Sequence, residues 1–400
     1  MIGLVAIAAQ PAMAQLGLPP VGLPALDSIT DTIGETLDHA AADTVRTARD
    51  LLRIRKIRLA RLMRDHPGDL EQDANGDLAR AGELFLLDAA PAAIDAARQA
   101  GFTVNGHEQI EGLAVEVVRL GVPRNLSLKE AEMALRRLLP DTTVSADTLH
   151  FPAGEAGKRV TTARSGSPAK SVRAPVGIID GAPGRHARPS AMRGFARGAP
   201  HPSHHGSAIV SLLDYAGVQD VRVADVYGTD PAGGNAMAIA KALGWLTQGG
   251  TKVVAISLVG PRNALLERAI ASAQKHGVII VAAVGNDGPA APPAYPASYR
   301  GVLAVTAVDG RNRALIEAGK ADHLDYAAPG ADLRVRNADG KATRVRGTSF
   351  AVPLVAARAA AHPGEISQIV THLDKEAVDL GKRGPDRVFG RGLVCGRCRP

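Results

Sequence analysis

The chain has 400 residues, of which 46% are hydrophobic, 22% are charged and only 3% are aromatic. This apolar content excludes a chain that is disordered throughout, and the length suits one large or two ordinary domains. The low aromatic content argues against an aromatic-rich sandwich or a surface that stacks single-stranded nucleic acid, so no nucleic acid is expected as a partner.

The net charge of +7 comes largely from two basic runs. Residues 46–64 hold eight basic residues against one acidic residue, and residues 158–197 hold nine against one. Both runs suit contact with acidic lipid or another polyanion. The alternatives are a solvated helix face for the first run and a flexible linker for the second.

The chain begins with the pattern of an export signal. Residues 2–9 are apolar, and Ala12-Met13-Ala14 before Gln15 matches the small-x-small pattern of a signal peptidase site. We therefore expect a signal peptide over residues 1–14 and an exported protein, either periplasmic or secreted. No basic residue precedes the apolar run, which suggests a signal that is truncated at its start.

Residues 15–68 are expected to form a helical N-terminal segment, because apolar residues recur at three- and four-residue spacing between Asp27 and Asp65. Over residues 80–151, predicted elements follow in the order strand, helix, strand, strand, helix, strand, which is that of the α+β ferredoxin-like fold. Ser127 and Glu130 predict a capping box for the second helix. The elements are expected at residues 83–87, 91–100, 101–104, 114–120, 127–139 and 143–150.

A composition rich in Gly, Ser, Ala and basic residues predicts a basic flexible linker over residues 152–174. Beyond it, over residues 175–394, apolar runs alternate with helical segments, which predicts an α/β domain with a doubly wound, mostly parallel sheet. Strands are expected at 176–179, 221–226, 253–257, 278–284 and 302–308, helices at 205–213, 235–247 and 263–276, and a hairpin over 333–345.

The tail, residues 395–400, contains the only two cysteines, Cys395 and Cys398. This spacing occurs in redox pairs, in halves of zinc sites and in small disulfides. No second Cys or His pair lies at zinc-ribbon spacing, so a structural disulfide is favoured.

Four polar side chains fall at the ends of predicted elements, where functional groups of α/β sheets collect. Asp180 ends a predicted strand, His205 begins a predicted helix and Asn286 follows a predicted strand. Taken alone, each has an ordinary structural alternative, which is a turn aspartate, a surface histidine and a turn asparagine, respectively. Ser349 stands between Gly347 and a run of small helix-forming residues, as either a helix N-cap or a nucleophile.

Taken together, these motifs resemble the subtilisin-like serine proteases, the subtilase or peptidase S8 family. The resemblance covers about residues 175–394 and rests on Val-Gly-Ile-Ile-Asp180-Gly, His205-Gly-Ser, Gly-Asn286-Asp-Gly-Pro and Gly-Thr-Ser349-Phe-Ala-Val-Pro, in that order. It implies that Asp180 orients His205, that His205 takes the proton of Ser349, and that Ser349 attacks the scissile carbonyl. The Asn286 amide and the Ser349 N–H would form the oxyanion hole.

The strand end Ser257-Leu258-Val259-Gly260 resembles the substrate-binding edge of the family, along which an extended peptide pairs with the main chain. Val259 stands where glycine is usual, which bears on the width of the first specificity pocket. The resemblance also implies that the ferredoxin-like block is an inhibitory propeptide whose tail, either residues 148–151 or the linker after them, lies in the active site until self-cleavage. The alternative is an ordinary accessory domain.

The sequence therefore predicts an exported serine endopeptidase that acts on polypeptides through an acyl-enzyme and is made as a self-processed precursor, inhibited by its own pro-region. No cofactor and no metal site are expected, and calcium is not predicted because no carboxylate cluster has calcium-loop spacing. The alternative is a catalytically silent protein of the same fold that docks on a membrane or polyanion through the basic runs.

Overall fold

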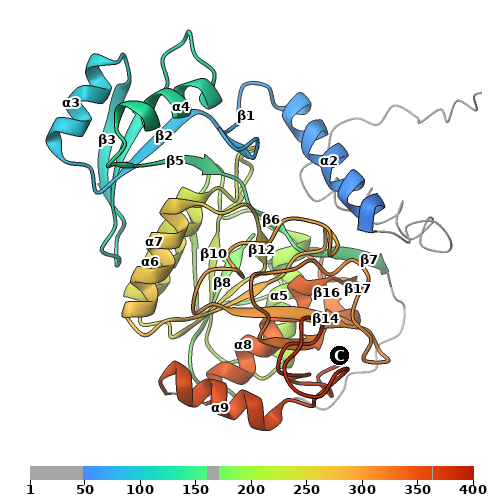
Figure 1. Cartoon of the computed structure of the whole chain (residues 1–400). Coiled ribbons are helices and arrows are strands. Elements are labelled where there is room, and N and C mark those ends of the chain that lie inside the picture. Colours follow the sequence, from blue (N-terminus) through green and yellow to red (C-terminus); the bar gives the residue numbers. More distant parts are fainter. Residues whose placement is uncertain (1–47, 160–170, 363) are drawn as a thin grey trace, which may run out of the picture.

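The computed structural model describes residues 48–159, 171–362 and 364–400 and shows a small N-terminal domain seated on a larger C-terminal domain, with one helix beside both (Figure 1). That helix is α2 (Ala48–Asp65). The predicted signal peptide and the first part of the predicted helical segment lie outside the described residues.

The N-terminal domain has the predicted ferredoxin-like order. Its sheet runs β5-β2-β4-β3, with neighbouring strands antiparallel, and the short β1 also pairs with β2. Ser127 and Glu130 form the expected capping box at the start of α4. The elements are β1 (Leu70–Gln72), β2 (Leu78–Leu87), α3 (Pro91–Gln99), β3 (Thr103–Gln109), β4 (Glu116–Gly121), α4 (Leu128–Leu138) and β5 (Thr143–Thr148).

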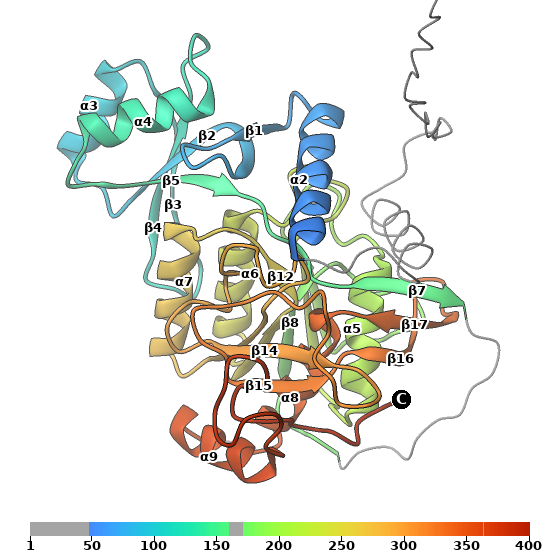
Figure 2. The same cartoon turned by 45° about the vertical axis from the view of Figure 1, so that its right-hand side comes forward.

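The two faces of this sheet are buried against different partners. Leu84 and Leu86 of β2 pack under α3 and α4, whereas Phe85 and Leu87, which point the other way, join the core formed by α6 and α7 of the C-terminal domain. Figures 1 and 2 show the N-terminal domain resting on these helices. Alternate side chains of β2 therefore form the core of the N-terminal domain and its contact with the C-terminal domain.

The C-terminal domain is the predicted doubly wound α/β fold. Its seven parallel strands run in the order β15-β14-β13-β11-β8-β10-β9. The strands are β8 (Val176–Asp180), β9 (Ala191–Gly194), β10 (Val221–Asp225), β11 (Val253–Ile256), β13 (Ile279–Ala283), β14 (Leu303–Val308) and β15 (Tyr326–Pro329).

Helices cover both faces of this sheet, because nearly every strand residue is apolar and buried. Along β8, Ile178 faces the core under α5 and α8, and Ile179 faces the core under α6 and α7. The helices are α5 (His204–Tyr215), α6 (Ala236–Gln248), α7 (Ala264–Lys275), α8 (Val352–Ala360) and α9 (Ile366–Glu376). The predicted hairpin is present as β16 (Ala331–Arg336) and β17 (Ala342–Arg346).

Part of the segment expected to be a flexible linker is ordered. β6 (Phe151–Pro152) pairs with β12 (Leu258–Val259), and β7 (Glu155–Arg159) pairs with β17. The composition is that of a linker, but partner strands from elsewhere in the chain satisfy its backbone groups, and tertiary pairing overrides local propensity. Residues 160–170 lie outside the described chain.

The tail closes against the C-terminal domain. Cys395 and Cys398 form a disulfide with a Cα–Cα distance of 5.2 Å, and Cys395 is buried in the core under α5 and α8. Of the helices in the described ranges, none has the length and apolar content needed to cross a membrane.

Candidate active site

Asp180 and His205 come together at the carboxyl edge of the central sheet. Asp180 ends β8 and is fully buried, and His205 lies in the first turn of α5 behind its N-cap, Ser203. The Nδ1 of His205 lies 3.0 Å and 2.9 Å from the two carboxylate oxygens of Asp180. The Nε2 of His205 is buried and has no hydrogen-bond partner among the described residues.

Ser349 lies in a single 3-10 turn, η1 (Thr348–Phe350), immediately before α8. The sequence had left open a helix N-cap at Ser349, but its Oγ donates to the carbonyl oxygen of Ser257 at 2.9 Å and caps no helix. The turn depends on Gly347, which has φ 141°; a Cβ there would lie 2.5 Å from Nδ2 of Asn286. Only glycine permits this close approach.

Two donors converge on one carbonyl group of the chain itself. The oxygen of Ala153 accepts hydrogen bonds from the backbone N–H of Ser349 at 2.8 Å and from Nδ2 of Asn286 at 2.7 Å. The Oδ1 of Asn286 accepts from the N–H of Thr348 at 3.0 Å, which fixes the orientation of the amide. The carbonyl of Ala153 is therefore held where an oxyanion hole would hold a substrate.

The predicted substrate-binding edge is occupied by residues 151–153. Phe151 and Pro152 pair with Val259 and Leu258, and the N–H of Ala153 donates to the oxygen of Ser257 at 3.0 Å. Gly260 differs from the other three edge residues, because its bridge partner is Tyr295. The chain from Phe151 to Ala153 thus lies as an added strand along this edge.

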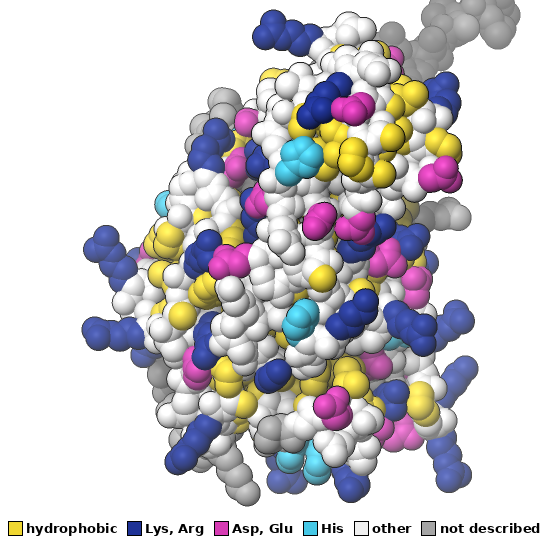
Figure 3. All heavy atoms as spheres, turned by 90° about the vertical axis from the view of Figure 1, so that its left-hand side faces the viewer, with side chains coloured by type: hydrophobic (Ala, Val, Ile, Leu, Met, Phe, Trp, Pro, Cys, Tyr) yellow, Lys and Arg dark blue, Asp and Glu magenta, His cyan; other side chains and the backbone are white. Residues whose placement is uncertain are grey.

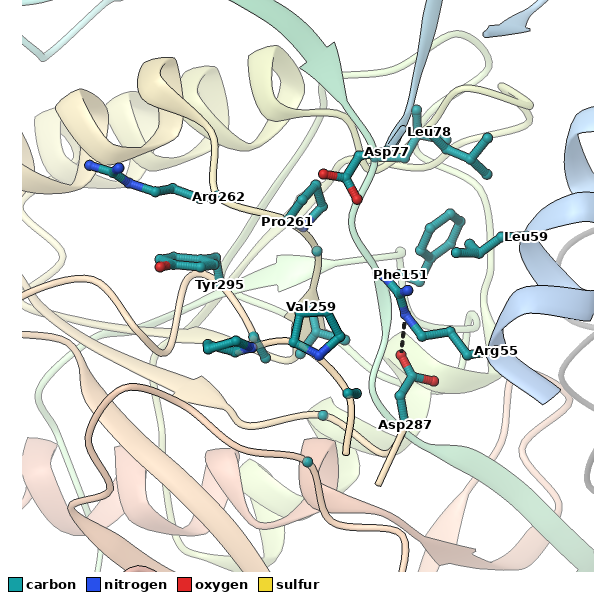
Figure 4. A pocket seen from close by; sticks show the side chains of 18 of the residues that line it. Arg55, Leu59, Asp77, Leu78, Phe151, Val259, Pro261, Arg262, Asp287 and Tyr295 are labelled. Carbon is teal, nitrogen blue, oxygen red and sulfur yellow. Dashed lines mark hydrogen bonds and ion pairs between the residues drawn. The ribbon is translucent and has the colours of Figure 1, made fainter. Parts of the chain in front are cut away.

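A cavity of about 320 Å³ lies beside this edge (Figure 4). Val259 and Gly285 both line the cavity, and both Val259 methyl groups lie 3.5 Å from where a Cβ on Gly285 would stand. Helix α2 forms the opposite wall, where Arg55 and Arg58 each donate to Asp287 at 3.1 Å. Sequence reasoning missed this contact, although the three-residue spacing of the arginines places both on one helix face.

Two titratable groups are buried where the N-terminal domain meets the C-terminal domain. Burial raises the pKa of Asp147 to about 7, opposed by a hydrogen bond from the N–H of Met237 and by the charge of Arg80. Burial lowers the pKa of His150 to about 4. Both shifts favour the neutral form, so docking is less costly than burying two charges.

Charged side chains of both signs and metal-ligating side chains also lie outside this site. On the face shown in Figure 3, Lys and Arg side chains are interspersed with Asp and Glu. Within the part of the chain that the structure describes, no three His, Cys, Asp or Glu side chains converge to hold a metal ion.

Known sequences match the C-terminal domain. The sequence model described as the Subtilase family matches residues 201–392. Subtilisin Savinase of Lederbergia lenta is 34% identical over 205 residues, which cover 48% of this chain and 75% of that protein. The minor extracellular protease Epr of Bacillus subtilis is 30% identical over 197 residues, which cover 48% of this chain but only 30% of Epr.

Solved structures match across both domains. Fervidolysin from Fervidobacterium pennivorans, described as a keratinolytic enzyme related to subtilisin, has a TM-score of 0.64 at 15% identity, covering 80% of this chain and 60% of that one. The epidermin leader peptide processing serine protease of Staphylococcus aureus has a TM-score of 0.59 at 15% identity, covering 79% and 97%. At this identity the likeness concerns the fold.

Proposed function

This chain belongs to the subtilase family, and we propose that it is a serine endopeptidase, made as a precursor that cuts its own chain between Ala153 and Gly154. The observation that carries the proposal is the Ala153 carbonyl, which accepts hydrogen bonds from Asn286 and Ser349 next to the Ser349 side chain. A substrate bond needs this placement for attack.

In the proposed reaction, Ser349 Oγ leaves the Ser257 carbonyl and turns toward the Nε2 of His205, which has no other partner among the described residues. His205 takes the hydroxyl proton while Oγ bonds to the carbonyl carbon of Ala153, and the oxygen becomes an oxyanion. His205 then gives the proton to the nitrogen of Gly154, the peptide bond breaks, and water hydrolyses the acyl-enzyme in a second round. Asp180 stabilises the imidazolium form of His205.

The N-terminal domain acts in this proposal as the intramolecular inhibitor. Its sheet is docked on α6 and α7, and the strand that leaves it fills the substrate-binding edge through residues 151–153. Other polypeptides bind the same edge once this segment leaves. Export is proposed from the signal-like residues 1–14, and it agrees with the relative that is named an extracellular protease.

The rival function, a silent protein that docks on polyanions, draws on the basic runs. Arg55 and Arg58 of the first run are paired with Asp287, however. Neither the Asp180–His205 pair nor a carbonyl held by Asn286 and Ser349 is needed for docking on charge.

The wild-type protein, purified from the full chain, is expected to carry a new N-terminus at Gly154, with the released fragment beginning at Gln15 if the signal has been removed. It is also expected to hydrolyse casein. Mass spectrometry of both termini and an activity assay make the test. An intact Ala153–Gly154 bond in a protein that hydrolyses casein would refute self-cleavage here; salt-dependent binding to heparin or anionic vesicles without hydrolysis would favour the rival.

A further inference from the structure

Residue Gly154, which follows the bond held in the active site, has no room for a side chain. A Cβ built on Gly154 would lie 2.5 Å from Cε2 and 3.0 Å from Cζ of Phe350, and 3.1 Å from Cβ of Ser349. Carbon atoms in van der Waals contact stand about 3.5–4.0 Å apart. Even the smallest chiral residue would therefore overlap the Phe350 ring.

The Phe350 ring is fixed where it stands. It is fully buried in the core under α5 and α8, and its centroid lies 5.3 Å from that of the His205 ring, tilted by 47°. A shift of Phe350 away from Gly154 would have to displace packed neighbours, which close-packed interiors resist. Ser349 cannot give way either, because its backbone N–H holds the Ala153 carbonyl.

We propose that Phe350 makes this site selective for peptide bonds that precede glycine. The inference rests on the proposed endopeptidase function. It extends to other substrates because any peptide whose carbonyl occupies the Asn286 and Ser349 donors brings its next residue to the place of Gly154. The substrates are then polypeptides with an exposed, extended segment that contains an Xaa–Gly bond.

The test uses peptides that carry residues 148–153 of this chain followed by Gly, Ala, Ser or Leu. The enzyme is the processed protein, prepared from the full chain. We expect kcat/KM for the glycine peptide to exceed that for the alanine peptide by about 10- to 100-fold. In Phe350→Met, which keeps apolar volume but has a flexible side chain, this ratio should fall toward one. Phe389→Met is the matched control and should keep the wild-type ratio.

A second measurement within the precursor does not need added peptide. Gly154→Ala should slow self-cleavage by a similar factor, and Phe350→Met in the same chain should restore it. A fluorophosphonate probe, whose leaving group is fluoride, reports an active Ser349 regardless of the residue that follows the bond. If the enzyme is labelled and cleaves the glycine, alanine and leucine peptides equally, the proposed selectivity is wrong but the proposed function stands. If the enzyme is neither labelled nor able to cleave any peptide, the proposed function is wrong.

A different observation concerns α2, which touches both the catalytic segment and the strand that leaves the N-terminal domain. Arg55 and Arg58 bind Asp287, the residue after Asn286, as Figure 4 shows for Arg55. Arg58 also lies over the Phe151 ring, 6.0 Å from its centroid. Leu62 is buried with Leu149 in an apolar cluster.

From these contacts we infer that α2 is a second clamp, which holds the cleaved pro-region on the enzyme and delays its release. Cutting Ala153–Gly154 breaks none of the contacts that α2 makes. Helix α2 contacts both Asp287 and residues 149–151, so it adds to the binding of the segment that occupies the substrate-binding edge.

The double variant Arg55→Gln/Arg58→Gln is expected to cut Ala153–Gly154 at the wild-type rate but to shorten the lag before it hydrolyses added peptide by about threefold to tenfold. Asp287→Asn should shorten the lag similarly, without adding to the arginine changes. Arg53→Gln/Lys56→Gln removes the same charge from exposed positions of α2 and is the control. Equal lags in the control and the Arg55/Arg58 variant would refute the clamp, and failure of every variant to cut or hydrolyse would count against the proposed function.

Discussion

Ser349→Ala is expected to leave the precursor uncut at Ala153–Gly154 and to remove peptide hydrolysis. The loss should be on the order of 10⁶-fold in turnover, the scale known for loss of the nucleophile in subtilisin, a relative of this chain. The physical reason is that the change removes the hydroxyl of the residue whose N–H, together with the Asn286 amide, already holds the Ala153 carbonyl oxygen. Gel analysis of the purified chain, fluorophosphonate labelling and peptide kinetics measure the effect.

The control is Ser367→Ala, an exposed serine on α9, which should be cut, labelled and active like the wild type. Ser349→Ala should still fold, as the uncut precursor with wild-type far-ultraviolet circular dichroism, because alanine fits the space of serine and the change removes one side-chain hydrogen bond, from Oγ to the Ser257 carbonyl. Wild-type labelling or processing of Ser349→Ala would contradict the assignment of Ser349 as nucleophile.

Asn286→Ala is expected to lower the rate of self-cleavage and the kcat for peptides by about 10²- to 10³-fold, with a much smaller change in KM. This range is the one established for the oxyanion asparagine of subtilisin. Asn286 supplies one of the two donors to the Ala153 oxygen, and the Ser349 N–H remains to supply the other. Single-turnover cleavage of the precursor separates this effect from pro-region release.

The matched control for Asn286 is Gln274→Ala, which removes a half-buried side-chain amide on α7 that donates to the Arg300 carbonyl, and it should leave kcat unchanged. If Asn286→Ala raised KM and left kcat as in the wild type, Asn286 would be a ground-state binding residue and the oxyanion role would be lost.

The order of helices and strands could be predicted wherever the apolar residues recur at a regular spacing. The ferredoxin-like order and the parallel sheet follow from alternating apolar runs and helical spacing, and the structure confirms both. β15 escaped prediction because Tyr326–Pro329 is short and ends in proline, and β9 because Ala191–Gly194 has no alternating pattern. Their strand form depends on neighbours that the local sequence does not encode.

The sequence predicted the four residues of the candidate site but not which residue of the chain occupies it. Asp180, His205, Asn286 and Ser349 are brought to one edge of the sheet, and their catalytic roles stay predictions. The sequence placed the tail of the N-terminal domain near the active site, but only the pairing with Ser257 and Leu258 identifies Ala153 as the residue held there. Register between distant strands is set by tertiary contacts, so composition could not supply it.

The pairing of β7 with β17 has a kinetic consequence for the cut chain. Glu155 pairs with Arg346, close to the Gly347 turn, so the new amine at Gly154 would remain tethered beside the acyl group on Ser349. A reacting group that is held in line for attack can reach an effective molarity of about 10⁵–10⁸ M, which lets the Gly154 amine compete with water for the ester. Cleavage of the Ala153–Gly154 bond would then be reversible as long as β7 stays paired with β17. Dissociation of β7 from β17 would be the step that makes maturation irreversible.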